Sequence, residues 1–249
     1  MATAAAAARA LPVVPGRRYD KVFFSSMAVL LLVIVLVGFG RTYFLKGLVL
    51  ANLPSPIIHV HGAVFTIWTL LLLTQTTLVA TGNVALHRKL GLWTFALSCA
   101  MPILGLAAAI NSLSRGFHVP GLDAETFFAI PVFSIVIFSV LIFFAYRERL
   151  NSAVHKRLVL LATIELMGAP TGRPPFTAIT GHPHTASVVV WALIAMLICY
   201  DLFALHTVNK ATLLGGLWLV IMDQLSVPIG FTPAWHAFAH ALQHVATRS

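Results

Sequence analysis

The sequence predicts an all-α integral membrane protein: a seven-transmembrane helix bundle with a two-hairpin internal repeat, followed by a C-terminal interfacial amphipathic helix. Three observations predict this class. Of the 249 residues, 59% are hydrophobic and only 9% are charged, whereas soluble domains carry about 25% charged residues. Seven apolar runs approach the roughly 20 residues that a helix needs to cross the hydrocarbon core. These runs also lack the apolar–polar alternation of membrane strands.

The seven runs are predicted to be the transmembrane helices of one membrane domain, residues 22–231. They cover Val22–Gly40, Pro56–Ala80, Leu90–Leu113, Phe127–Tyr146, Leu158–Gly172, Ala186–Leu205 and Ala211–Phe231. The first exceeds the apolar core of about 7–15 residues found in signal peptides, so we interpret it as a retained anchor. The fifth is the shortest; it holds Glu165 and ends in Gly168-Ala169-Pro170. Residues 1–21 are expected to be a disordered, basic N-terminal segment.

Basic residues between the runs predict the orientation. One set of connections carries Arg9, Arg17, Arg18, Lys21, Arg88, Lys89, Arg147, Arg149, Lys156, Arg157 and Lys210; the opposite side carries Arg41, Lys46, Arg115, Arg173 and Arg248. Because the richer side is cytoplasmic in most membrane proteins, we expect the N-terminus inside and the C-terminus outside. The formal net charge of +9 then favours contact with the anionic head groups of the lipid bilayer, and no nucleic acid is expected as a partner.

Residues 232–249 are predicted to form an amphipathic helix and tail at the outer interface. Thr232-Pro233 is a helix start signal, with Thr as the N-cap and Pro at the first position. One face would carry Trp235, Phe238, Leu242 and Val245, and the other His236, His240, Gln243, His244 and Thr247. A helix divided in this way is expected to lie flat on the membrane surface.

Two segments, residues 57–98 and 125–166, are predicted to be copies of one helical hairpin. A shift of 68 residues aligns Val64-Phe65-Thr66-Ile67 with Val132-Phe133-Ser134-Ile135, and His87-Arg88-Lys89-Leu90 with His155-Lys156-Arg157-Leu158. Membrane folds built from repeats often place functional sites at the repeat interface.

Eleven histidines fall into two layers, and the outer layer is a candidate for zinc or copper binding. Its candidate ligands are His59, His61, His182, His184, His236 and His240. His236 and His240 are four residues apart and could chelate, whereas His59 and His61 point about 200° apart on a helix. The alternative is that histidine merely supplies the polar face of an interfacial helix. A zinc hydrolase is disfavoured, because no carboxylate is evident beside these histidines.

The inner layer suggests a cofactor. His87 and His155 begin equivalent helices of the two hairpins, and His206 lies at the same boundary. Two histidines on neighbouring helices are how a b-type haem is often held in a bundle. The alternative is a set of interfacial histidines within a basic collar.

Five polar residues fall inside apolar runs: Gln75, Glu165, Asp201, Asp223 and Gln224. Each carboxylate costs about 2.5–3.5 kcal/mol on insertion scales, so such groups suggest a proton relay or an ion site. An inter-helix hydrogen-bond network is the alternative, at well under about 2 kcal/mol per contact.

From Tyr19 onward, the chain resembles a group of bacterial multi-pass membrane proteins of unassigned function. The resembling stretches are His59-Val60-His61-Gly62 with Trp68 and Gln75, Leu86-His87-Arg88-Lys89-Leu90-Gly91, His155-Lys156-Arg157-Leu158 with Leu160-Leu161-Ala162-Thr163-Ile164, Tyr200-Asp201-Leu202, Ala211-Thr212-Leu213 with Gly215-Gly216, and Thr232-Pro233-Ala234-Trp235. The resemblance implies the seven-span architecture and a bacterial inner (cytoplasmic) membrane location. It implies no reaction, cofactor or catalytic residue.

Three functional hypotheses follow. The first is a histidine-liganded redox or metal-handling membrane protein that holds b-type haem or copper/zinc. The second is a non-catalytic accessory or assembly subunit that packs against other membrane subunits. The third is a proton-coupled carrier that uses Glu165, Asp201 and Asp223. Nucleotide-binding, zinc-protease and serine-hydrolase motifs are absent from the sequence.

Overall fold

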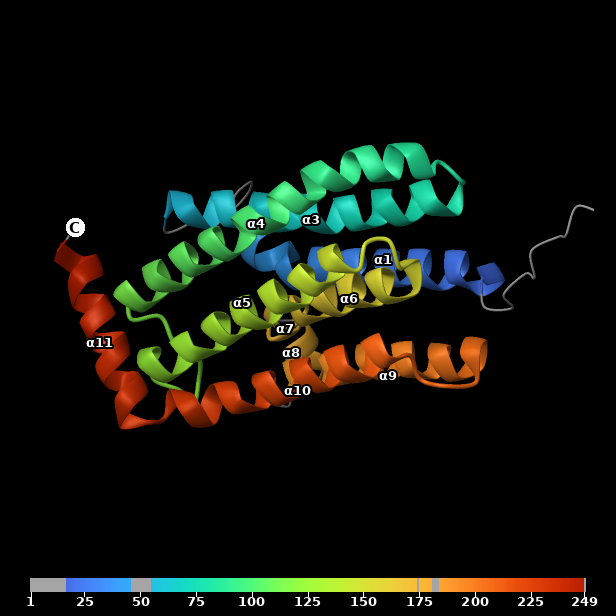
Figure 1. Ribbon diagram of the computed structural model, residues 1–249. Helices are drawn as coiled ribbons and strands as arrows, with labels where there is room; N and C mark the ends of the chain where they lie inside the picture. Colours follow the sequence, from blue (N-terminus) through green and yellow to red (C-terminus); the bar gives the residue numbers. More distant parts are fainter. Residues whose placement is uncertain (1–16, 46–54, 174, 181–183, 249) are drawn as a thin grey trace, which may run out of the picture.

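The computed structural model describes residues 17–45, 55–173, 175–180 and 184–248, and this part of the chain is helical without a strand (Figure 1). The elements are α1 (Arg17–Phe39), η1 (Gly40–Phe44), α3 (Pro56–Ala80), α4 (Val84–Ser114), α5 (Ala124–Arg147), α6 (Ser152–Glu165), α7 (Gly168–Thr171), α8 (Phe176–Thr180), α9 (Thr185–Leu205), α10 (Lys210–Gly230) and α11 (Pro233–Arg248). The all-α class predicted from the composition is confirmed.

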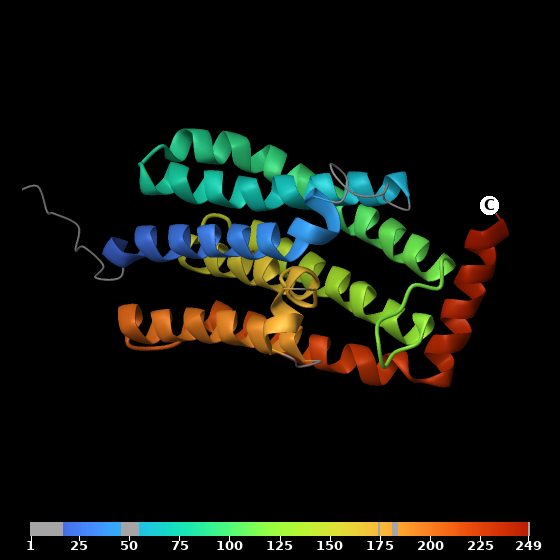
Figure 2. The same cartoon turned by 180° about the vertical axis from the view of Figure 1, so that it is seen from behind.

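Six helices in the described ranges are long and apolar enough to cross a membrane: α1 with η1, α3, α4, α5, α9 and α10. They lie side by side in a bundle (Figures 1 and 2). We call the end that holds the start of α1 the N-terminal end, and the opposite end, which α11 crosses, the α11 end. Transmembrane character is therefore well founded, and six of the seven predicted spans match a helix.

The fifth predicted span is divided, so the count of seven helices is not confirmed. Helix α6 has 14 residues, which is about 21 Å, and a turn at Leu166 and Met167 separates it from the short α7. Pro170 has no backbone N–H to donate. The two pieces nevertheless follow α1: Lys156 pairs with Asp20, and a Cβ on Gly38 would lie 2.4 Å from the carbonyl oxygen of Pro170.

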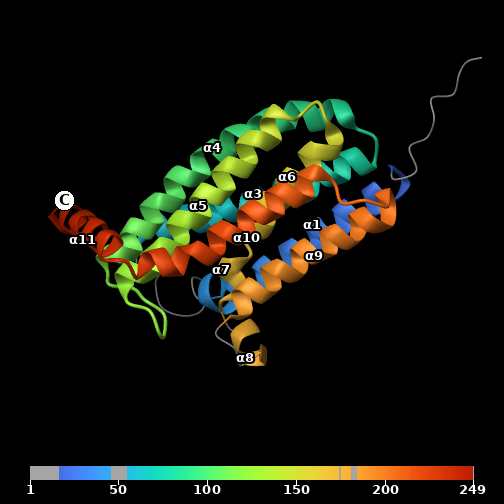
Figure 3. The same cartoon turned by 60° about the horizontal axis from the view of Figure 1, so that its bottom comes forward.

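Helix α6 lies at the centre of the bundle, and eight of its residues are buried. Its apolar side chains join one large core with α1, α5, α9 and α10, to which Leu31, Ile137, Leu161, Leu197 and Leu219 each contribute a fully buried side chain. Figure 3 shows α1 beside α9, with α8 projecting from the bundle. The polar residues of α6 are consequently held among apolar neighbours.

The predicted hairpins share a local feature at the N-terminal end. The side chain of Asn83 accepts from the backbone N–H of Leu86 at the start of α4, and Asn151 accepts from Val154 at the start of α6. The two helices differ in length, because α4 has 31 residues and α6 has 14. The internal repeat stays a prediction.

The two ends of the chain differ from the predicted boundaries. Residues 1–16 of the segment predicted to be disordered lie outside the described residues, while α1 already begins at Arg17. At the other end, Thr232 Oγ1 accepts from the backbone N–H of Trp235, as the predicted cap requires. Helix α11 then packs across the ends of α4 and α5 (Figure 1).

The buried face of α11 includes Trp235 and Leu242 of the predicted apolar face, but not the whole of it. Ala239 is fully buried, and Trp235 packs beside it, whereas Phe238 and Val245 are 53% and 68% exposed. Two predicted polar residues, His236 and Gln243, face the bundle and bond to it. Helix α11 is therefore bound to its own bundle by polar as well as apolar contacts.

Candidate functional site

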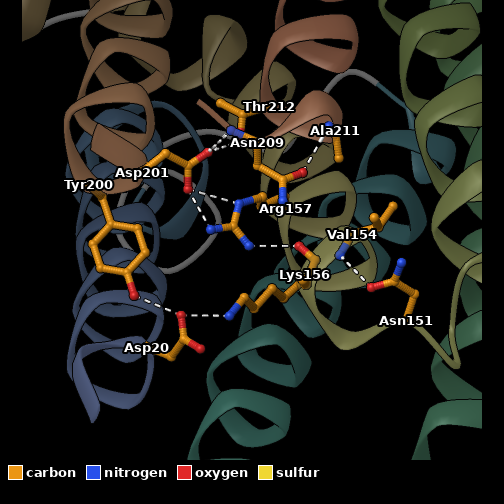
Figure 4. Close-up of polar contacts among 11 residues, drawn as sticks. Asp20, Asn151, Val154, Lys156, Arg157, Tyr200, Asp201, Asn209, Ala211 and Thr212 are labelled. Atoms are coloured by element: carbon orange, nitrogen blue, oxygen red, sulfur yellow. Dashed lines mark hydrogen bonds and ion pairs between the residues drawn. The ribbon is translucent and has the colours of Figure 1, made fainter. Parts of the chain in front are cut away.

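A fully buried ion pair joins α6 and α9 (Figure 4). Arg157 and Asp201 are 1% and 0% exposed. Arg157 Nε donates to Asp201 Oδ1 at 2.9 Å, Nη2 donates to the same oxygen, and Nη1 donates to Ala153 O at 2.7 Å. Leaving either charge buried without the other would be costly. The pair therefore fixes the packing of α6 against α9.

The second oxygen of Asp201 is also fully engaged. It accepts from the backbone N–H of Asn209 at 3.0 Å and from Thr212 Oγ1 at 2.5 Å, which joins α9 to the start of α10. Both oxygens of this carboxylate therefore accept hydrogen bonds, and one of the donors is a buried cation. We therefore assign Asp201 to architecture and withdraw it from the predicted proton relay.

A second acidic residue, Asp20 of α1, lies at the edge of this network (Figure 4). Asp20 Oδ1 lies 2.5 Å from Lys156 Nζ and accepts from the Tyr200 hydroxyl at 2.6 Å. The Tyr200 ring stacks on Phe23, with centroids 3.9 Å apart. Lys156 and Arg157 are adjacent on α6 and point to different neighbours. Lys156 pairs with α1, and Arg157 pairs with α9.

Glu165, the last residue of α6, lies deep in the bundle. Its side chain is only 7% exposed, and Ser134 Oγ of α5 donates to its Oε1 at 2.8 Å. Asp223 of α10 lies near enough to act on Glu165 electrostatically, with an unfavourable sign between two carboxylates. Among the described residues, no Lys, Arg or His forms an ion pair with Glu165. Glu165 thus lacks the compensation that Asp201 has.

Asp223 is only partly buried and has neutral partners. Its Oδ2 accepts from the Gln224 side chain at 2.9 Å and from Ser187 Oγ of α9 at 3.4 Å. The sequence placed Glu165 in the fifth predicted span and Asp223 with Gln224 in the seventh, and the structure brings the two carboxylates into one electrostatic neighbourhood. Ser134, which supplies the hydrogen bond to Glu165, was not among the predicted residues.

The predicted inner histidines are only partly brought together. His87 and His155 interact electrostatically across α4 and α6. His155 Nδ1 lies 2.8 Å from Ala145 O. The Gln75 amide, oriented to accept from Gly91 N–H, lies 2.6 Å from His87 Nδ1. His206 is exposed at the end of α9 with φ of 56°, so it belongs to a helix terminus rather than to this pair.

The predicted outer histidines of the described residues lie on three separate segments: α3, the residue before α9, and α11, where the ring centroids of His236 and His240 are 6.4 Å apart. His59 is exposed, His61 stacks on Phe65 with centroids 4.1 Å apart, and His184 precedes α9. His182 lies outside the described residues. Within the described ranges, no three His, Cys, Asp or Glu side chains are grouped as a metal site. The predicted zinc or copper ligands therefore have no support from the arrangement.

His236 and His240 instead face two acidic residues at the start of α5. His236 Nε2 lies 3.8 Å from Asp123 Oδ1, and His240 Nδ1 lies 3.4 Å from Glu125 Oε1. The expectation that no carboxylate lies beside the outer histidines is wrong, because the packing of α11 brings His236 and His240 beside acids that are distant in the sequence. The backbone N–H of Thr126 holds the pKa of Asp123 below its usual value, and the charge of His236 adds to this.

A basic group lies beyond the break in the fifth span. The guanidinium of Arg173 donates to Ala169 O and lies 4.8 Å from the ring centroid of Phe39. Arg173 is also near enough to His61 to act on it electrostatically. The Nδ1 atom of His61 and the Oγ1 atom of Thr42 are buried without a hydrogen-bond partner in the described part of the chain.

Sequence reasoning missed Arg157, Ser134, Asp123 and Glu125. One signal was available in the sequence: an Asp201 buried in an apolar run requires a cation. Lys156 and Arg157 are consecutive on one helix, where successive side chains point about 100° apart, so they cannot both face the same side. No protein-family model matches the chain, and no curated protein or solved structure matches it either.

Proposed function

We propose that the protein is a proton-coupled membrane carrier in which Glu165 is the proton-binding group. The observation that carries the proposal is the contrast between two buried acids. Asp201 has a buried guanidinium and two further donors, whereas Glu165 has one hydroxyl and a neighbouring carboxylate. A buried charge without compensation is costly, so Glu165 is suited to gain and lose a proton.

The position of Glu165 supports the same role. It is the last residue of α6, directly before the turn that separates α6 from α7. Discontinuous helices near the middle of the membrane are common at the binding sites of secondary transporters. Asp223 would make the doubly ionised state of the site unfavourable, which couples its charge to the protonation of Glu165.

The same reading gives the membrane topology that we propose. Helices α6 and α7 together would form the fifth of seven crossings, because they extend along α1 from Asp20 to Gly38. The excess of Lys and Arg at the N-terminal end supports an N-terminus in the cytoplasm and a C-terminus outside, in a bacterial inner membrane. An odd number of crossings is what opposite locations of the two termini require.

A histidine-liganded redox protein is the second candidate, favoured by the proximity of His87 and His155. Its support is weaker because the Gln75 amide donates to His87 Nδ1, which leaves the ring proton on Nε2, the atom that would bind iron. A Soret band that disappears in His155→Ala would replace the carrier proposal. Stable co-purification with other membrane subunits would instead favour the accessory-subunit hypothesis.

The carrier proposal is tested in proteoliposomes loaded with a fluorescent pH indicator. Small carboxylates, inorganic phosphate, amines and neutral sugars are added in turn, and proton movement into the lumen is recorded. At least one class should move protons with the wild type, and Glu165→Gln should abolish the response. The control is Glu148→Gln, which changes an exposed acid in the α5–α6 connection. Silence of the wild type towards every class, or a full response from Glu165→Gln, would overturn the proposal.

A further inference from the structure

Two histidines of α11 each lie beside an acid at the start of α5. His236 Nε2 is 3.8 Å from Asp123 Oδ1, and His240 Nδ1 is 3.4 Å from Glu125 Oε1. All four side chains reach the surface, with exposed fractions between 16% and 56%, so they can exchange protons with water. A carboxylate attracts an imidazole fully when the ring is protonated, so the attraction between α11 and α5 depends on the charge of these two histidines.

The position of His236 is fixed in both of its charge states. Thr126 Oγ1 donates to Gly230 O at 3.2 Å, and the same oxygen lies 3.2 Å from His236 Nε2. Because a hydroxyl has a single proton, His236 Nε2 is the donor in the second contact. Loss of the proton on Nδ1 would then remove the positive charge and leave this hydrogen bond in place. The charge of the ring acts on Asp123, the acid beside Nε2.

The charged groups around the two pairs leave these acids as the direct partners of the histidines. The other titratable side chains of α11, of the end of α4 and of the connection after α4 are Arg115, His118, His244 and Arg248. Arg115 Nε donates to Asn111 O, and His118 Nδ1 lies 3.1 Å from Gly116 O, so both contact their own segment. The last turn of α10, residues 226–230, contains no titratable side chain.

Asp123 is charged over the whole range in which histidine titrates. The backbone N–H of Thr126 and the charge of His236 hold the pKa of Asp123 below its ordinary value of 3.8. Histidine changes its charge between about pH 5 and 8. The change in attraction within this range therefore comes from the imidazole and not from Asp123.

Helix α11 covers an apolar cluster where it crosses the ends of α4 and α5 (Figure 1). Ala239 of α11 is buried together with Ala109 and Leu113 of α4 and Phe128 of α5. Gln243 also donates to Leu113 O at 3.0 Å. These contacts do not titrate, so they hold α11 in place at any pH and the histidine pairs add to them.

We propose that α11 is a pH-responsive strap whose docking on α4 and α5 is strengthened when His236 and His240 are protonated. The added attraction is present at the acidic end of the histidine range and is lost as the pH rises. Acidification at the α11 end would hold the strap closed over the apolar cluster, and a higher pH would loosen it. This inference does not depend on the proposed carrier function.

The test is hydrogen exchange of the α11 amides in the full-length protein in detergent, between pH 5.5 and 8. Rates are corrected for the intrinsic effect of pH, and amides of α3 serve as an internal reference. Protection of α11 should fall as the pH rises, by about 2- to 5-fold for each pair, since partly exposed ion pairs are weak. The variant that carries both His236→Gln and His240→Gln should lose this dependence.

Matched variants separate the strap from a general effect of pH on the bundle. Glu125→Gln should remove the same part of the response as His240→Gln, and the two changes together should remove no more than either alone. His206→Asn changes an exposed histidine at the other end of the bundle, and Glu165→Gln changes the proposed proton site. Both should keep the wild-type profile.

Three outcomes would overturn the strap. One is wild-type protection of α11 that stays constant or rises between pH 5.5 and 8. Another is a full response in the double histidine variant. The third is a loss in His206→Asn equal to that in His240→Gln.

Discussion

Arg157 and Asp201 form a buried ion pair in which two guanidinium nitrogens donate to one carboxylate oxygen, across 44 residues of sequence. The pair lies at the N-terminal end of the bundle and connects its central helix to α9 and α10. The membrane domain therefore contains two kinds of buried acid. Asp201 has a buried cation and further donors, whereas Glu165 has neither a cation nor more than one described donor.

Removing one member of this pair should be strongly destabilising. Asp201→Asn leaves the Arg157 charge buried without its counter-ion, and breaking a buried pair costs about 3–5 kcal/mol. The measurement is thermal unfolding in detergent, followed by circular dichroism. Arg149→Ala serves as the control because Arg149 is exposed and its side chain contacts its near neighbour Tyr146, donating to Tyr146 O at 3.2 Å. Equal melting temperatures for Asp201→Asn and Arg149→Ala would contradict the structural assignment of Asp201.

Glu165→Gln should have the opposite effect on stability. Glutamine keeps an oxygen that can accept from Ser134 and removes the repulsion from Asp223. The melting temperature of the variant should therefore equal or exceed that of the wild type. Any gain in the free energy of unfolding should be on the order of 1 kcal/mol. Loss of function together with retained stability is typical of residues kept for activity.

Ser134→Ala is the companion variant. It leaves the Glu165 carboxyl without its one described donor, so it should lower the melting temperature of the wild type. Ser134→Ala should have less effect in the Glu165→Gln background, because the glutamine amide can also donate hydrogen bonds to acceptors that a carboxylate cannot use. A clear destabilisation by Glu165→Gln would show that Glu165 is a structural acid and would count against its role as a proton site.

Asp123 should make the stability of the α11 end depend on pH. Its carboxylate accepts from the backbone N–H of Thr126 at 2.7 Å and faces His236. The folded-state pKa of Asp123 lies below its ordinary value of 3.8. Its contribution is therefore fully present above the ordinary pKa and is lost as the pH falls through the folded-state pKa.

Hydrogen exchange of α11 amides at a series of acidic pH values would measure this effect. Exchange should accelerate, relative to its intrinsic rate, as the pH falls below the ordinary pKa of Asp123. Asp123→Ser keeps an N-cap oxygen for Thr126 but cannot titrate, so its protection should depend less on pH in this window. The same pH profile in both proteins would refute the assignment.

Local chemistry explains how much of this fold could be predicted. The caps at Asn83, Asn151 and Thr232 depend on neighbours within three residues, and apolar run length alone identifies six helices. Long-range neighbours were not predictable in the same way, because periodicity does not say which helix lies opposite a given face. This is why the sequence places Arg157 among the basic residues of the predicted cytoplasmic connections and not opposite Asp201.

The fifth span and the histidine layers show the same limit. The sequence Gly168-Ala169-Pro170 indicated a weak helix, but only the packing of Pro170 on α1 shows where the chain turns. The two histidine layers followed from topology, which sorts residues by depth and not by lateral position. Lateral position places His236 beside Asp123, and it groups no three His, Cys, Asp or Glu side chains of the described residues into a metal site.

The contact between α1 and α7 gives a direct test of the broken fifth span. A Cβ on Gly38 would lie 2.4 Å from the oxygen and 2.5 Å from the Cβ of Pro170, both atoms that cannot rotate away. Gly38→Ala should therefore force α7 from α1 and destabilise the protein by about 1–3 kcal/mol, the usual cost of overpacking. Gly40→Ala is the matched control in the adjacent η1 turn, where nothing lies within 4 Å of the added atom. Its melting temperature should equal or exceed that of the wild type. If both variants melt alike, α7 does not pack on α1, and the fifth crossing proposed here loses its support.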